Sequence, residues 1–137
     1  MKPIIRNVIA VVLGWIVGSA VNMGLIKLGH QVFPIEGVDI NDMEALAAVM
    51  PTLGSEFFLF PFLAHALGTL VGAAIAAIIA FKHKLKMAMF VGVLFLLGGI
   101  MVNMMLPGPT WFTVVDLVVA YIPMAWIGGV ITQKITK

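Results

Sequence analysis

Long apolar runs dominate the pattern of residues along this chain. Four of them cover residues 4–29, 57–81, 87–106 and 110–131. Each is long enough to cross a hydrocarbon core of about 30 Å, which takes roughly 20 helical residues. Lipid offers no partner for an unpaired peptide group, so each run is predicted to be an α-helix. The expected fold class is therefore an all-α integral membrane protein. Its single transmembrane domain, 1–137, is a four-transmembrane-helix bundle.

The outer loop, residues 30–56, contains the pattern of a short amphipathic helix. Asn41 is followed three residues later by Glu44, which is typical of a helix N-terminus, and Pro51 supplies a stop. We expect a helix over 42–50, with an apolar face at i, i+3, i+4 and i+7 formed by Met43, Leu46, Ala47 and Met50. Such an extracytoplasmic helix lies on the membrane surface or covers the end of the bundle, and the second arrangement is favoured.

The charged residues indicate how the chain is oriented. They make up 10% of the sequence against 62% hydrophobic residues, too little polar surface for a water-soluble domain. All basic residues except Lys27 fall near the two termini or between the second and third spans. The positive-inside rule makes that side cytoplasmic, with the acidic loop 30–56 outside. We expect a multi-pass protein of a bacterial cytoplasmic (inner) membrane, with both termini in the cytoplasm.

Two features suggest how the helices are related. Residues 12–23 of the first span resemble residues 93–104 of the third, with Gly18 and Gly99 at matching positions. The second and fourth spans align more weakly. A duplicated helical hairpin with its pseudo-twofold axis along the membrane normal explains the match. Chance similarity between apolar segments is the alternative.

Small residues form continuous rows on the first two spans. The second span carries one at every fourth position, and the first span has a matching pair; together these are Ala64, Gly68, Gly72, Ala76, Gly14 and Gly18. Such rows let helix backbones approach closely, which is a main source of helix association in lipid. Tight packing is expected, either within one chain or between copies. Besides the lipid bilayer, the expected partners are therefore further copies in a homo-oligomer or other membrane subunits.

Few polar residues lie inside the spans, and they form the candidate site: Asn22, His65, Thr69, Asn103, Asp116 and Tyr121. At a rise of 1.5 Å per residue, one polar side chain from each helix falls about 5–12 Å below the outer boundary. An ionisable group in hydrocarbon costs about 2.5–3.5 kcal/mol, so Asp116 should face the interior and contact His65. Asn22 and Asn103 are expected to supply hydrogen bonds to this pair. The alternative is a purely structural cluster that bridges the helices, with Asp116 lining the outer vestibule.

Two prolines interrupt helical hydrogen bonding. Pro123 is expected to kink the fourth span about one turn from Asp116, and Pro61 to loosen the outer end of the second span.

The motifs that the chain lacks narrow its function. It has no cysteine, which excludes disulfides, thiolate metal sites and iron–sulfur clusters. It also lacks the phosphate-binding, dinucleotide-binding, zinc-protease and serine-hydrolase signatures. No catalytic residue, metal or cofactor is predicted, and a net charge of +2 scattered along the chain gives no nucleic-acid footprint. A non-catalytic protein is favoured over an enzyme.

Three functions remain. A polar site in the outer half of the bundle favours a small oligomeric permeation or transport protein. The first alternative is a non-catalytic accessory or assembly subunit of a membrane complex. The second is a lipid- or quinone-binding membrane protein that uses His65 and Asp116.

Overall fold

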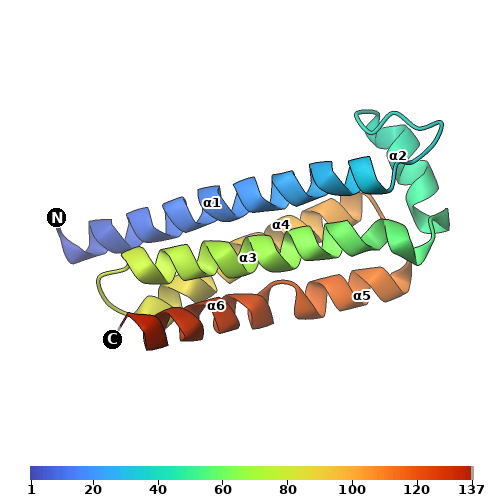
Figure 1. Ribbon diagram of the computed structural model, residues 1–137. Helices are drawn as coiled ribbons and strands as arrows, with labels where there is room; N and C mark the ends of the chain where they lie inside the picture. The colour runs from blue at the N-terminus through green and yellow to red at the C-terminus, as the bar shows by residue number, and fades with distance from the viewer. Residues whose placement is uncertain (137) are drawn as a thin grey trace.

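The computed structural model describes residues 1–136, and over these residues it is helical with no strand. Four helical segments long and apolar enough to cross a membrane run side by side (Figure 1). They are α1 (Pro3–Val32), α3 (Leu59–Ile79), α4 (Lys84–Met105) and the consecutive helices α5 (Thr110–Val119) and α6 (Ile122–Ile135). The prediction of an all-α chain with four such segments is confirmed.

Several helix ends differ from the prediction, some because the helix continues past the apolar run and one because it stops short of the end of the run. Helix α1 extends beyond residue 29 to Val32, and α4 begins at Lys84 rather than at 87. Helix α3 ends earlier than expected, at Ile79, and the chain reverses through His83, whose φ of 56° lies in the left-handed region. Some polar and basic residues beside the apolar runs therefore belong to the helices, as Lys84 does, whereas others, such as His83, form the turn.

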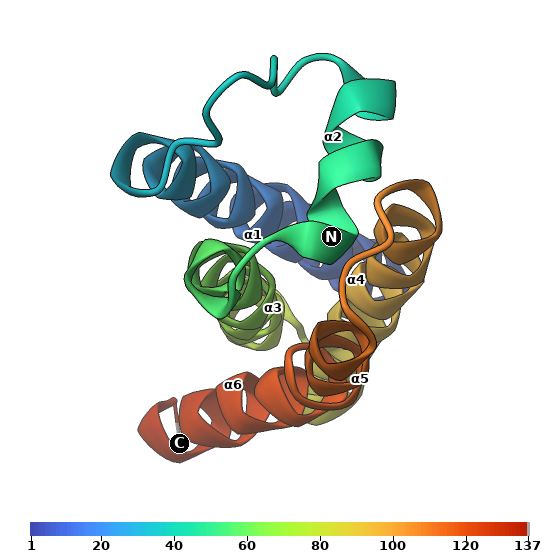
Figure 2. The same ribbon diagram turned by 90° about the vertical axis from the view of Figure 1, so that its right-hand side faces the viewer.

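The outer connection folds over one end of the bundle. Helix α2 (Met43–Val49) lies across that end (Figures 1 and 2). Short 3-10 turns follow it at Met50–Thr52 and Ser55–Phe58. Leu46 is only 7% exposed, which supports the covering role, whereas Met43 is 44% exposed and does not belong to the buried face. Side chains of a helix lean toward its N-terminus. The side chain of Met43, the first residue of α2, therefore projects past the end of the helix and away from the surface that α2 covers.

The N-cap of α2 differs from the predicted one by one residue. The N-cap is Asp42 rather than Asn41: its carboxylate accepts hydrogen bonds from the backbone N–H groups of Glu44 and Ala45, both at 3.1 Å. The Asn41 side chain instead donates to Asp39. Either residue type can cap a helix, so the pattern left the position uncertain by one residue.

Helix α3 is the centre of the bundle, with α1, α4 and α6 packed around it (Figure 2). A side-chain carbon added at Gly18 would lie 2.5 Å from the Gly68 carbonyl oxygen, and one at Gly72 would lie 2.6 Å from the Gly14 carbonyl oxygen. The backbones of α1 and α3 are thus in contact along the small-residue row. Ala64 and Ala76 in this row are fully buried within one chain. The row needs no second copy to cover it.

Polar side chains of α1 fasten its first turns to the end of α3. The Arg6 Nε donates to the Ile79 carbonyl at 2.6 Å, and Asn7 accepts a hydrogen bond from the Phe81 backbone N–H at 2.9 Å. These contacts satisfy backbone groups that a helix end leaves unpaired. Both termini and the α3–α4 turn lie at this end, opposite α2 (Figure 1). Within residues 1–136 the basic residues other than Lys27 therefore gather at one end, and the acidic loop lies at the other, as predicted.

The fourth span is broken rather than merely kinked. Helix α5 ends at Val119 and α6 starts at Ile122, with Pro123 in its first turn. Proline lacks an N–H, and its ring clashes with the carbonyl four residues earlier, which here belongs to Val119. The break has no counterpart in α3, where Pro61 lies in the first turn and the helix continues past it without interruption. The duplicated hairpin stays a prediction.

Candidate functional site

Three polar side chains form one hydrogen-bonded network in the half of the bundle nearer α2. His65 on α3 and Asp116 on α5 are joined by a 2.8 Å hydrogen bond between Nδ1 and Oδ1. Tyr121, at the break between α5 and α6, donates its hydroxyl hydrogen to the other carboxylate oxygen at 3.0 Å. Asp116 is 0% exposed and Tyr121 is 1% exposed. The predicted contact between His65 and Asp116 is confirmed.

The helix break places Tyr121 in this network. In an unbroken helix a residue five positions after Asp116 would point about 140° away from it. The irregular backbone at Ala120 and Tyr121 instead lets the hydroxyl reach back to the carboxylate. Gly99 on α4 provides the space, because a side-chain carbon there would collide with the Tyr121 ring. The ring also stacks on the His65 imidazole, with centroids 5.7 Å apart.

The bonding pattern leaves one edge of the imidazole without a partner. Both Asp116 oxygens and the His65 Nδ1 are engaged, and Nε2 has no hydrogen bond to any of residues 1–136. The 2.8 Å bond is compatible with more than one placement of the hydrogens. When the Asp116 carboxyl donates to Nδ1, or when both ring nitrogens carry a hydrogen, Nε2 is a donor; when a neutral ring carries its hydrogen on Nδ1, Nε2 is an acceptor.

His65 forms part of the wall of two cavities. The outer cavity, with a volume of about 130 Å³, lies beneath α2 and has a mostly apolar lining that includes Leu46 and Met50. Its polar side chains are His30, His65 and Asn103. Sequence reasoning missed His30, because the first span was ended at residue 29. Its spacing from Ile26 does place both on one helical face, which was the available signal.

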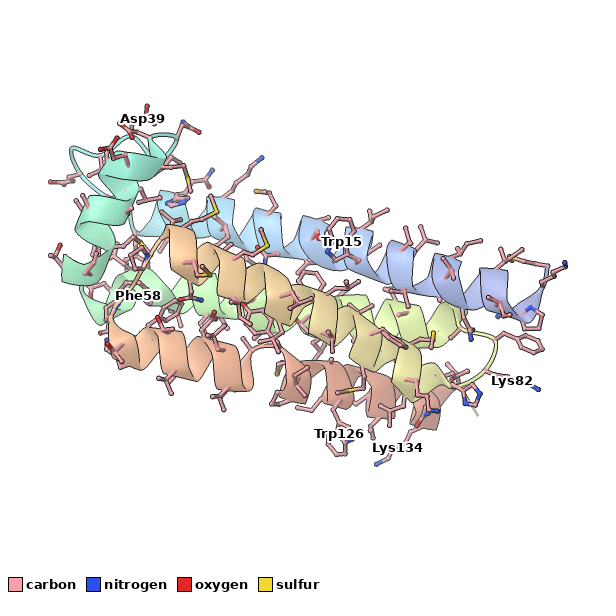
Figure 3. The ribbon with its side chains drawn as sticks, turned by 180° about the vertical axis from the view of Figure 1, so that it is seen from behind. Trp15, Asp39, Phe58, Lys82, Trp126 and Lys134 are labelled. Atoms are coloured by element: carbon pink, nitrogen blue, oxygen red, sulfur yellow. The ribbon has the colours of Figure 1, made fainter. Side chains whose placement is uncertain are left out.

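The side cavity, of about 270 Å³, lies between α1 and α4. Figure 3 shows one of its lining residues, Trp15, on α1. It shares the His65 and Val102 walls with the outer cavity. Ser19 and Asn22 line it from α1, and neither side chain has a hydrogen bond within the described part of the chain. The remaining lining is apolar or aromatic, from Trp15, Met23, Leu94, Phe95, Gly98, Gly99 and Tyr121.

The other predicted site residues do not bond to the His65–Asp116 pair. Asn103 donates to the Gly99 carbonyl at 3.0 Å and accepts from the Thr113 hydroxyl at 3.1 Å, so it links α4 to α5. Asn22 lines the side cavity and has no hydrogen bond to Asp116. The predicted bonds from Asn22 and Asn103 to the pair are therefore wrong. A helical asparagine can bond to the carbonyl one turn before it, which competes with contacts across the bundle.

Thr69 lies one helical turn from His65 toward the inner end. It is fully buried, and its hydroxyl has no partner among residues 1–136. It supports the packing of α3 but does not join the network.

The donor set does not resemble a metal centre, since residues 1–136 contain no group of three or more His, Asp or Glu side chains that could hold an ion. Comparison of the chain with protein-family models, with curated proteins and with solved structures gives no match.

Proposed function

We propose that this protein binds a small amphipathic molecule of the lipid or quinone class in the outer half of its helix bundle. The observation that carries the proposal is the state of His65. Its Nδ1 is held by a buried carboxylate, and the residue lines two cavities. We infer that Nε2 carries a hydrogen, and the ring is then preorganised to donate from it to an acceptor oxygen of a ligand.

The size and lining of the cavities fit this class of ligand. A dry apolar cavity of about 150 Å³ is enough to bind benzene, so the outer cavity of about 130 Å³ is of the size of one ring. The side cavity is larger, at about 270 Å³, and adds aromatic walls. Apolar walls with a few polar groups are typical of small-molecule sites.

Binding fits the structure better than permeation through one chain does. Toward the inner end the space between helices is filled by fully buried side chains, among them Ala73, Ala77, Ala88 and Val91. The small-residue row that motivated an oligomeric pathway is covered by α1. A docking role in a larger complex gains no specific support, because the exposed apolar side chains are equally suited to lipid.

The proposed setting is a bacterial cytoplasmic membrane, with α2 and the binding site toward the outside. The chain has no native cysteine, so single-cysteine variants give an unambiguous label position. We expect Asp42→Cys to react with an impermeant maleimide in intact cells and Lys82→Cys to react only after lysis. Labelling of Asp42→Cys from the cytoplasmic side alone would reverse the proposed orientation.

The test of binding uses a short-chain alkyl benzoquinone as the probe and the protein reconstituted in lipid nanodiscs. We expect His65→Ala to weaken probe binding about tenfold or more, because a lost hydrogen bond to a buried donor is worth roughly 1–3 kcal/mol. His83→Ala, in the turn between α3 and α4 at the opposite end of the bundle (Figure 1), is the matched control and should bind as the wild type does. Equal affinity of all three proteins would refute the proposed function.

A further inference from the structure

The lining of the side cavity distinguishes it from the outer one. Its mouth consists of residues in the middle of α1 and α4, and these are exposed: Trp15 is 49%, Met23 56% and Leu94 42% exposed. In a transmembrane bundle, exposed apolar side chains at this level face lipid. The side cavity therefore opens toward the hydrocarbon, not toward water.

Some of the side chains that line the same cavity are polar. Ser19 and Asn22 are three residues apart on one face of α1, and His65 lies in the wall as well. The two α1 side chains have no hydrogen-bond partner within residues 1–136. An unsatisfied polar group facing an apolar medium is costly, so these groups favour a ligand that supplies matching polar atoms.

We propose that the side cavity is a lateral entrance through which a quinone-class molecule passes from the outer leaflet to His65. Its ring lies between the aromatic side chains of Trp15, Phe95 and Tyr121, and its carbonyl oxygens accept hydrogen bonds from His65 and Asn22. Its apolar tail remains in the lipid beyond Leu94 and Gly98. This inference rests on the proposed function. It adds the route by which the ligand enters and the positions of its ring and its tail.

Two glycines provide a matched test. A side-chain carbon added at Gly98, in the cavity lining, or at Gly24, outside it, would meet no other atom within 4 Å. Leucine is therefore expected to be accepted by the fold at both positions, but only at Gly98 does it fill the entrance. Equal melting temperatures of Gly98→Leu and Gly24→Leu in detergent establish that both variants are folded.

With the alkyl benzoquinone probe in nanodiscs, Gly98→Leu should weaken binding about tenfold or more, whereas Gly24→Leu should bind as the wild type does. Asn22→Ala, which removes a polar contact without filling the cavity, should weaken binding severalfold. Unchanged affinity of both Gly98→Leu and Asn22→Ala, with His65→Ala still impaired, would overturn the lateral entrance and leave the binding site intact, reached through the outer cavity. Unchanged affinity of His65→Ala as well would overturn the proposed function itself.

Discussion

Replacing Asp116 with alanine is expected to destabilise the protein by about 3–5 kcal/mol, the range found when one partner of a buried pair is removed. The carboxylate accepts from Tyr121 and is bonded to His65, and all three groups are largely buried. Its loss leaves a tyrosine hydroxyl and an imidazole nitrogen without partners in a site that water cannot easily reach. Unfolding in mixed detergent micelles, followed by circular dichroism, measures the change.

Asp116→Asn is the matched control because it preserves volume and two polar atoms. Its oxygen can accept from His65 Nδ1 while its amide donates to Tyr121, so we expect a smaller loss than for alanine. In a double-mutant cycle, Asp116→Ala with His65→Ala should cost less than the sum of the single changes, because the two residues share one interaction. Additive costs would mean that the hydrogen bond between them does not stabilise the fold.

Replacing Gly72 with leucine is expected to separate α1 from α3. Even the first side-chain carbon would lie 2.6 Å from the Gly14 carbonyl oxygen, and a backbone atom cannot move aside without displacing its helix. Overpacking of a tight core costs roughly 1–3 kcal/mol, and a clash with backbone lies at the upper end or beyond it. We expect a large fall in melting temperature at every protein concentration.

Gly24→Leu on α1 is the control, since the space around Gly24 is open. Its stability should change by less than about 0.5 kcal/mol, as is usual for surface substitutions. The small-residue row was also compatible with packing between copies. If Gly72→Leu leaves the single chain as stable as the wild type and only dissociates an oligomer, α1 does not pack on α3 through the small-residue row.

The helices could be predicted from the sequence because lipid imposes one solution on a long apolar run. The inner ends were harder to place, since lysines and a histidine are compatible with both a helix and a turn. At α2 the capping pattern fixed the helix but not the cap, because Asn41 and Asp42 can each serve. Hydrophobic pattern therefore specifies the existence of these elements better than their limits.

The site could be predicted only in part. The cost of a carboxylate in hydrocarbon was enough to pair Asp116 with His65. The estimated depth of each side chain could not distinguish Asn103 from the residues that form the hydrogen-bonded network. Asn103 bonds within α4 and to α5 instead. The estimated depth also could not show that Tyr121 reaches Asp116, because that contact depends on how far the helix opens at Pro123. The two cavities arise from the angles between helices, which a sequence pattern does not encode.

We expect His65 to present a donor at Nε2 for a ligand while Asp116 holds Nδ1. Nitrogen NMR of isotope-labelled histidine in bilayers measures both atoms directly, with His30→Gln and His83→Gln variants assigning the signals. We predict that Nε2 of His65 carries a hydrogen, that its resonance shifts when the alkyl benzoquinone is added, and that the Nδ1 hydrogen bond to Asp116 persists. A bare Nε2, or a His65 spectrum that the probe leaves unchanged, would contradict the account.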